Sequence, residues 1–267
     1  MPTIQRPEIV TSPKNPLLGR LRRASTRGTL TDDGCCIAES FHLLEEAIRS
    51  DCHIPAVLCS SSVRSTVEAH VRGLKQVRVF ILPDELFAEV SVTEASQGVI
   101  ALVKPPSWTM DHLFRGRAMV VVLDGVQDPG NLGAILRAAE AFGASGALLL
   151  KGTVNPYNPK ALRASAGSVF RLPIVMGVES AMAHAALAQH RLDIYAASAK
   201  ASKTLHEMDL SRRFALIIGS EAHGISPKLA SAAMDFRIVT TGVESLNAAM
   251  AAGVILHEAS RQRLIRK

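Results

Sequence analysis

Three polar, glycine-containing segments in the second half of the chain carry the residue types from which a reaction site could be built. The first runs Leu123-Asp-Gly-Val-Gln-Asp-Pro-Gly-Asn-Leu-Gly-Ala-Ile-Leu-Arg137. Asp128 followed by Pro129 is typical of a helix start, which places Asn131 in the first turn and Arg137 about two turns along. Six helical residues turn through roughly 600°, so the two side chains do not stack, but they can border one cleft.

A capped helix with a solvent-facing arginine would explain Asp128 and Pro129 without any function. That alternative leaves unexplained the glycines at positions 125, 130 and 133, which surround the turn. A residue without a Cβ lets another backbone or a ligand approach closely. The first segment is therefore a candidate binding loop as well as a helix start.

The second segment, Ile218-Gly-Ser-Glu-Ala-His-Gly-Ile225, follows an apolar run and places Glu221 and His223 between two glycines. Its spacing differs from the Gly-x-Ser-x-Gly of a hydrolase nucleophile elbow. The chain also contains neither Gly-x-Gly-x-x-Gly nor a P-loop, so the usual dinucleotide and phosphate signatures are missing. His223 alone is more typical of a loop histidine than of a general base.

The third segment, Thr240-Thr-Gly-Val-Glu-Ser-Leu-Asn247, leads into a helix that begins with small residues. Ser245 is the predicted N-cap of that helix. Taken alone, polar residues at this place are most simply caps. The small residues Ala248, Ala251, Ala252 and Gly253 would allow close packing against another helix or a second subunit.

The elements that must position these segments alternate between strand and helix. We predict strands at 118–123, 147–150, 169–175, 193–197, 215–218 and 236–239, and helices at 129–142, 160–166, 180–190, 227–234 and 246–264. Apolar runs such as Met119–Leu123 indicate strands buried on both faces, hence a mostly parallel sheet covered by helices. Functional loops of such sheets follow the carboxyl ends of strands, where the three segments begin.

The first hundred residues predict a smaller α/β domain. We expect helices at 37–49 and 62–73 and strands at 56–59, 77–82 and 98–103. The sequence Lys104-Pro-Pro-Ser107 follows and favours a linker, because proline can neither donate to a ladder nor continue a helix. The predicted organisation is a basic arm at 1–28, a domain at 29–104, a linker at 105–111 and a second domain at 112–267.

Composition indicates a folded protein with a polyanionic partner. Of 267 residues, 48% are hydrophobic and 20% charged, and the net charge is +6. Residues 1–28 hold six basic side chains against one acid. They form either a solvated tail or an arm that contacts phosphates. Aromatic residues make up only 4%, which favours recognition by arginine and backbone groups over base stacking.

The cysteines predict no metal site. Cys35, Cys36, Cys52 and Cys59 lack the spacing of a zinc knuckle, and mostly buried, reduced thiols are the expected alternative. The chain opens with no signal-peptide pattern and contains no apolar run of membrane-spanning length. We therefore expect a cytoplasmic protein.

Read together and in this order, the three segments resemble the three motifs of the SpoU (TrmH) family of SPOUT methyltransferases. Asn131 with Arg137 matches the first motif. Gly219 with Glu221 and Gly224 matches the second, and Ser245-Leu246-Asn247 with the small-residue helix matches the third. The resemblance covers about Val120 to Arg263. Residues 37–103 are similar, more loosely, to the L30e-like substrate-binding domain that often precedes it.

The resemblance implies an α/β fold in which the second domain forms a trefoil knot. It implies transfer of a methyl group from S-adenosylmethionine to a ribose 2′-hydroxyl of structured RNA, with 23S rRNA favoured, by a homodimer formed through the last helix. Gly219, Ile238 and Leu246 would contact the cofactor. Arg137 would be catalytic, with Asn131, Glu221, Ser245 and Asn247 ordering it and the substrate.

Arginine is an awkward general base because its pKa exceeds 12, so Arg137 could instead stabilise negative charge or hold a phosphate, and the base stays open. The sequence departs from the family pattern at Val239, where a proline is usual, and at Asn247-Ala-Ala-Met. Three alternatives remain: a tRNA methyltransferase, a non-catalytic RNA-binding protein of the same fold, and an α/β enzyme that handles a nucleotide cofactor or a small-molecule substrate.

Overall fold

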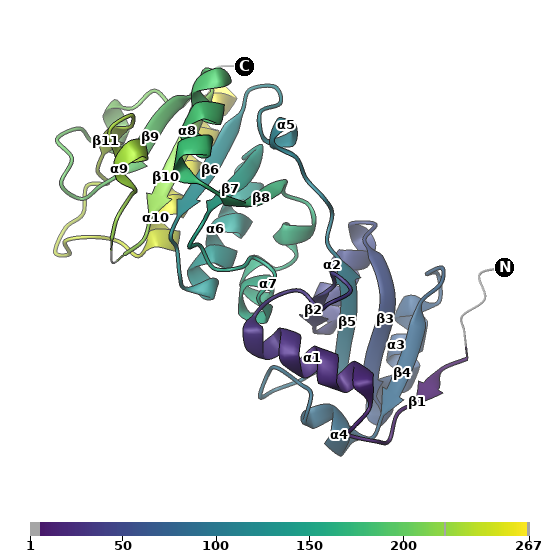
Figure 1. The fold of residues 1–267 in the computed structure, drawn as a ribbon. Helices are drawn as coiled ribbons and strands as arrows, with labels where there is room; N and C mark the ends of the chain where they lie inside the picture. Colours follow the sequence, from purple (N-terminus) through teal and green to yellow (C-terminus); the bar gives the residue numbers. More distant parts are fainter. Residues whose placement is uncertain (1–5, 222, 266–267) are drawn as a thin grey trace. The chain divides into compact units, whose positions relative to one another are not determined.

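The computed structural model describes residues 6–221 and 223–265, which belong to two compact units (Figure 1). Unit 1 comprises Met1–Pro106 and Asn155–Phe170, and unit 2 comprises Ser107–Val154 and Arg171–Lys267. The segment Asn155–Phe170 thus packs with the amino-terminal part of the chain although unit 2 flanks it on both sides. The predicted domain division with one linker at 105–111 stays a prediction.

Unit 1 is built on a five-stranded mixed sheet in the order β1-β4-β3-β5-β2. Its strands are β1 (Glu8–Ile9), β2 (Cys36–Glu39), β3 (His53–Ser60), β4 (Arg78–Leu82) and β5 (Val99–Lys104). Its helices are α1 (Pro16–Arg27), α2 (Phe41–Arg49), α3 (Arg64–Val71), α4 (Asp84–Ala88) and α7 (Pro159–Ser165), with 3-10 turns at Ser61–Val63 and Ser168–Phe170. β5 is antiparallel to both of its neighbours, whereas β1, β4 and β3 are parallel.

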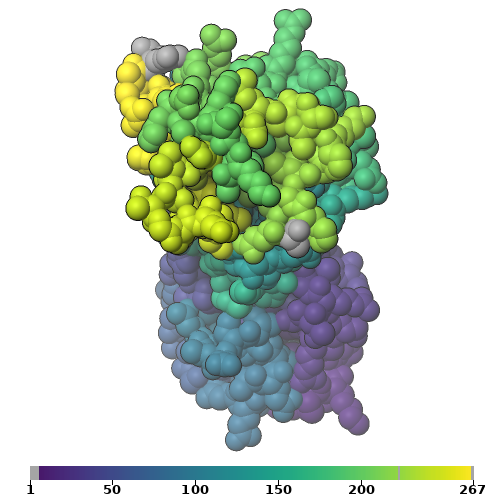
Figure 2. All heavy atoms as spheres, turned by 90° about the vertical axis from the view of Figure 1, so that its left-hand side faces the viewer, coloured from purple at the N-terminus to yellow at the C-terminus, as the bar shows by residue number. Residues whose placement is uncertain are grey.

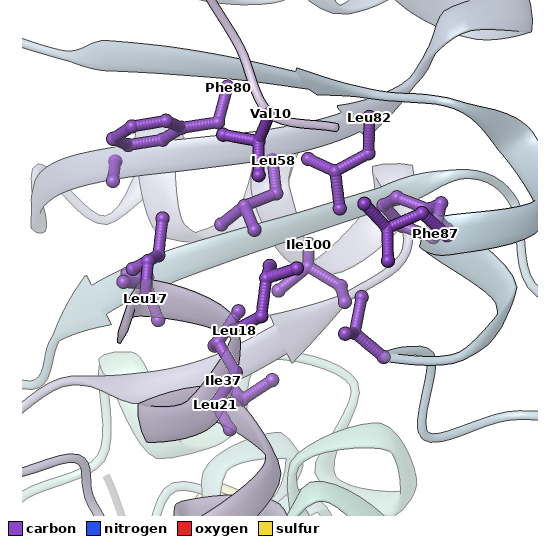
Figure 3. Close-up of a cluster of buried hydrophobic side chains, with 14 of the residues drawn as sticks. Val10, Leu17, Leu18, Leu21, Ile37, Leu58, Phe80, Leu82, Phe87 and Ile100 are labelled. Carbon is purple, nitrogen blue, oxygen red and sulfur yellow. The ribbon is translucent and has the colours of Figure 1, made fainter. Parts of the chain in front are cut away.

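The amino-terminal residues are folded into unit 1. Helix α1 begins after Asn15, whose side chain accepts from the Leu17 amide, and its apolar face is buried. Figure 3 shows Leu18 and Leu21 of this helix pointing toward Ile100 of the sheet, within one apolar cluster. The solvated-tail alternative is therefore wrong for the helix, because burial of its leucines holds it on the sheet.

The basic charge of α1 is partly neutralised by nearby acids. Arg20 pairs with Asp33 at 2.8 Å and Arg23 lies 3.6 Å from Asp32. Arg22 pairs with Glu89 at 3.0 Å. The excess of basic over acidic residues within 1–28 thus overstates the positive charge that α1 presents to a partner, because the acids that pair with it come from later segments of the chain.

The predicted helix at 37–49 is wrong in its first part. Residues 36–39 form β2, which pairs antiparallel with β5, and the helix starts at Phe41 after Ser40 at φ 139°. Glu39 is buried within β2 and accepts hydrogen bonds from the segment 91–96. Pairing with a strand more than 60 residues away overrode the local helical pattern.

Unit 2 is built on a six-stranded parallel sheet in the order β11-β9-β10-β6-β7-β8. Its strands are β6 (Met119–Asp124), β7 (Gly146–Leu150), β8 (Ile174–Val178), β9 (Asp193–Ala197), β10 (Phe214–Gly219) and β11 (Met234–Phe236). Its helices are α5 (Met110–Leu113), α6 (Pro129–Ala141), α8 (Ser180–Gln189), α9 (Pro227–Ala230) and α10 (Ala248–Ile265), with a 3-10 turn at Leu205–Glu207.

Helices cover both faces of this sheet. Side chains from α5, α8 and α9 share one apolar cluster with Val120 and Val122 of β6. α6 and α10 pack together on the opposite face (Figure 1). Met119–Leu123 is accordingly fully buried, which confirms the predicted α/β fold with a parallel sheet covered on both sides. The predicted trefoil knot stays a prediction.

Some predicted boundaries in unit 2 need correction. The strand expected at 169–175 is wrong at its start, since residues 168–170 form a 3-10 turn of unit 1 and β8 begins only at Ile174, after Pro173. The strand expected at 236–239 is wrong in most of its length, since β11 ends at Phe236, and the helix expected from residue 246 begins at Ala248. Among the described residues, no helix has both the length and the apolar character required to cross a membrane.

Candidate active site

Strand pairing brings the first two polar segments together. β6 and β10 are neighbours in the parallel sheet, and Gly219 at the end of β10 lies opposite Asp124 at the end of β6. The loops that follow the two strands therefore leave the sheet side by side. In the space-filling view, chain segments in green and yellow, which come after β8, form most of the visible surface of unit 2 (Figure 2).

The first loop ends at the predicted helix cap. Asp128 Oδ1 accepts a hydrogen bond of 2.7 Å from the Asn131 amide, and Pro129 occupies the first helical position. Gly125 has φ +73°, a conformation that favours glycine, and its amide donates to Thr153 Oγ1. The predicted N-cap is confirmed, and Asn131 starts the helix that carries Arg137.

The second loop is a tight reversal. Ser220 and Gly224 exchange two backbone hydrogen bonds of 3.0 and 2.9 Å. A Cβ on Gly219 would lie 2.5 Å from the carbonyl carbon of Gly224, so only glycine fits there. The sequence analysis predicted a close approach only at the glycines of the first segment, so this contact of Gly219 is a finding of the structure. The His223 amide donates to Ser220 Oγ, and the residue is exposed.

The third segment is capped by a different residue from the one predicted. Asn247 Oδ1 accepts from the Ala249 amide at 2.9 Å, whereas Ser245 is exposed and lies outside the helix. Asn247 takes the cap because it immediately precedes Ala248, the first residue of α10. The N-cap prediction for Ser245 is therefore wrong.

Side chains from all three segments meet in one hydrogen-bonded group, the Asn131 triad of Asn131, Glu221 and Asn247. Asn247 Nδ2 donates to Asn131 Oδ1 at 3.0 Å, and Asn131 Nδ2 donates to Glu221 Oε1 at 3.2 Å. Since Asn247 also caps α10, its amide is fixed at both ends. The triad joins residues that are 90 and 116 positions apart in the chain.

Two adjoining cavities flank the triad. The β10–α10 cavity, of about 530 Å³, is lined by all three residues predicted to bind cofactor and by Ser245: Gly219, Ile238, Leu246 and Ser245. The β6–β10 cavity, of about 590 Å³, is lined by residues that include Asp124, Asn131 and Ser226. Both share Gly219, Ser220, Glu221, Gly224 and Ala248. Glu221 thus borders both spaces.

Two side chains of the β6–β10 cavity were not singled out from the sequence. Asp124 Oδ2 accepts a hydrogen bond of 2.7 Å from the Ser226 amide. Ser226 Oγ is buried and has no hydrogen-bond partner among the described residues. A buried hydroxyl without a hydrogen-bond partner lowers the stability of the folded protein. A polar ligand in the cavity could supply the missing partner of Ser226. Asp124 is the last residue of the buried strand β6, at its carboxyl end, a signal that could have identified it.

Arg137 lies apart from this group. It is exposed on α6, and its guanidinium makes no hydrogen bond or ion pair with any described residue. It lines neither of the two cavities. The helix therefore carries Asn131 to the meeting point of the three segments and turns Arg137 toward solvent. The structure centres the site on Asn131, and the predicted catalytic role of Arg137 stays a prediction.

Comparison with known protein families finds two matches. Residues 118–257 match the SpoU rRNA methylase family, and residues 15–101 match the MRM3-like substrate-binding domain. The first match contains all three polar segments. The second includes α1, which lies within the predicted basic arm at 1–28.

Individual proteins are similar over nearly the whole chain. An uncharacterised tRNA/rRNA methyltransferase of Synechocystis is 33% identical, with 95% of this chain and 94% of the relative covered. The 23S rRNA (guanosine(2553)-2′-O)-methyltransferase RlmP of Bacillus subtilis is 28% identical, with 93% and 97% covered. Among solved structures, an AdoMet-bound rRNA methyltransferase from Sinorhizobium meliloti has a TM-score of 0.82 at 26% identity, covering 96% of this chain and 98% of that one.

Proposed function

Because this chain belongs to the SpoU rRNA methylase family, we propose that it transfers a methyl group from S-adenosylmethionine to a ribose 2′-hydroxyl of rRNA. The observation that carries the proposal is the position of Glu221, which lines two adjoining cavities and is hydrogen-bonded within the Asn131 triad. Methyl transfer needs one space for the donor, a second for the nucleotide, and polar groups at their boundary. The names of the relatives and the matched substrate-binding domain support rRNA as the substrate.

The β10–α10 cavity fits the methyl donor. Its volume lies in the range of small-ligand sites. Ile238 and Leu246 offer apolar surface for a flat adenine, and the carboxylates of Glu221 and Glu244 suit a positively charged sulfur. When bound, S-adenosylmethionine supplies a methyl group that is already activated for transfer. The part of the protein is then to align the acceptor hydroxyl and assist loss of its proton.

The β6–β10 cavity is assigned to the target nucleotide. Asn131 borders it. The side-chain amide of Asn131 donates from Nδ2 to Glu221 and accepts at Oδ1 from Asn247. Such a side chain holds one orientation and can order the ribose without rearranging. Glu221 borders both cavities, so its carboxylate faces both the donor space and the nucleotide space.

Arg137 is assigned to RNA binding on the exposed face of α6, outside both cavities. Its guanidinium is exposed and makes no hydrogen bond or ion pair with the described residues, a state that suits contact with a phosphate. The sequence left open whether Arg137 holds a phosphate or stabilises negative charge at the ribose hydroxyl. Its exposed position agrees better with holding a phosphate than with acting on a hydroxyl bound in the site of the same chain.

We also propose that the protein is a cytoplasmic homodimer formed through α10. Met250 and Val254 lie one turn apart on this helix and are 62% and 42% exposed. Gly253 beside them has open space around its Cα. An apolar stripe with a small residue is a surface on which a second α10 can pack closely.

The test is methylation in vitro of an unmodified 23S rRNA transcript, with tRNA assayed in parallel and the modified position mapped by 2′-O-methyl sequencing. We expect one methylated ribose in the rRNA and none in tRNA. Methylation of tRNA alone would overturn the substrate assignment. S-adenosylmethionine binding without methylation of any RNA would overturn the proposed reaction.

A further inference from the structure

A basic hollow of about 400 Å³ lies in unit 1, whereas both cavities described above are lined by residues of unit 2. Three segments far apart in the chain form its walls: the last turns of α1, the segment 89–92 after α4, and residues 158–163 at the start of α7. Figure 1 shows the end of α1 beside α7. We call this feature the α1–α7 hollow.

The two helical walls are held firmly. The apolar cluster of Figure 3 fixes α1, and α7 buries Ala161 and Leu162 and packs against β2. Gly28 ends α1 at φ +63°, where an added Cβ would overlap the Asn158 side-chain amide. The end of α1 and the start of α7 are therefore in direct contact, and their side chains keep a fixed spacing.

The third wall is held by the buried carboxylate of Glu39, which is 2% exposed. It accepts hydrogen bonds from Ser91 Oγ at 2.6 Å and from the Val92 amide at 2.8 Å. Thr93 Oγ1 and Ser96 Oγ donate to the same carboxylate at 2.8 and 2.7 Å. These hydrogen bonds fix the segment 91–96, which has no regular secondary structure. Moving the segment would leave a buried carboxylate without hydrogen-bond donors, which is costly.

The charges in the hollow are predominantly positive. Arg22, Lys160 and Arg163 line it, with Glu89 as its acid, and Arg22 pairs with that acid. The exposed Arg163 guanidinium forms no hydrogen bond or ion pair with the described residues. The hydroxyls of Ser25 and Thr26 add hydrogen-bond donors beside these cations. A fixed set of cations and hydroxyls matches a phosphodiester, which is anionic and offers acceptor oxygens.

We propose that the α1–α7 hollow binds the sugar-phosphate backbone of the RNA substrate, with Arg163 as its principal phosphate contact. The inference rests on the proposed function, because it takes RNA as the substrate. It assigns substrate binding to α7, a helix that lies inside the match to the methylase family and yet belongs to unit 1. The amino-terminal basic residues contribute mainly through Arg22.

The test compares binding of an unmodified 23S rRNA transcript by the wild-type protein and by a Lys160→Gln/Arg163→Gln variant at several salt concentrations. Each lost phosphate contact makes the slope of log affinity against log salt shallower by about 1. We expect a slope shallower by about 1 to 2, weaker binding, and unchanged S-adenosylmethionine affinity by calorimetry. The matched control is Arg72→Gln/Lys75→Gln, which removes two exposed cations of unit 1 outside the hollow.

An unchanged slope in the hollow variant would overturn the inference, as would an equal loss in the control, which would indicate only general attraction by charge. Wild-type protein that binds S-adenosylmethionine but no RNA would overturn the proposed function together with the inference. Wild-type protein that methylates the transcript while the hollow variant binds it equally well would overturn the inference alone.

Discussion

The side-chain amide of Asn131 donates a hydrogen bond from Nδ2 to Glu221 Oε1 across 3.2 Å, although the two residues are 90 positions apart along the chain. Parallel pairing of β6 with β10 makes this contact possible, because it places the ends of both strands at one edge of the sheet. Glu221 lines both cavities and Asn131 lines one of them, so the contact lies where a donor and an acceptor could meet.

Replacing Asn131 with alanine removes the member of the triad that contacts both others. We expect methyl transfer in single-turnover assays to fall about 100-fold, since small misplacements of reacting groups cost factors of this order. S-adenosylmethionine affinity should change little. The control is Gln189→Ala, which removes an exposed amide at the end of α8. Equal rates for the two variants would contradict the role assigned to Asn131.

Replacing Gly219 with alanine forces a Cβ to within 2.5 Å of the Gly224 carbonyl. The backbone pair of Ser220 and Gly224 must then open, and these two residues line both cavities. We expect a loss of about 1–3 kcal/mol in the free energy of unfolding, with S-adenosylmethionine binding abolished in calorimetry. Gly73→Ala serves as the control, because open space surrounds that glycine. Cofactor binding retained by Gly219→Ala would argue against the β10–α10 cavity as the donor site.

Glu258 on α10 gives stability a defined pH dependence. Hydrogen bonds from Arg261, and next from Gln262, lower the pKa of this carboxyl from 4.5 to about 2. A lowered pKa stabilises the folded state above the unfolded value, and this contribution disappears as pH falls through the folded value. In urea titrations, Glu258→Gln should be less stable than wild type at pH 7, and the difference should shrink between pH 4.5 and 2.

The control for this titration is Glu85→Gln, which alters an exposed carboxylate with no ion pair to the described residues. Its difference from wild type should stay small at every pH. A Glu258→Gln difference that stays constant from pH 7 to pH 2 would show that the carboxylate charge is not what stabilises this end of α10.

Replacing Val254 with glutamate places a charge in the apolar stripe of α10. If that stripe forms the dimer, sedimentation should show a shift toward monomer, because an unpaired charge is costly to bury at an interface. The matched control is Met182→Glu on α8, where the methionine is 65% exposed outside the stripe. A Val254→Glu protein that sediments like wild type would place the interface elsewhere.

The sequence by itself determined the class of the fold and singled out the three polar segments whose side chains meet at the candidate site. Apolar runs that alternate with segments of helical periodicity predicted a parallel sheet covered by helices, and Asp128-Pro129 predicted the start of α6. These features depend on local physics, namely burial of apolar runs and capping of a helix end, so neighbouring residues suffice to predict them. The order of the three motifs also sufficed for the family resemblance.

Only the tertiary structure decided which of these residues meet. Residues 36–39 read as helix but pair as a strand with β5, and Asn155–Phe170 joins unit 1 although its neighbours in sequence belong to unit 2. Asn131 meets Glu221 and Asn247, while Arg137 turns to solvent. The physical reason is shared: strand pairing, helix packing and side-chain direction depend on partners far away in the chain, whose positions the local pattern does not contain.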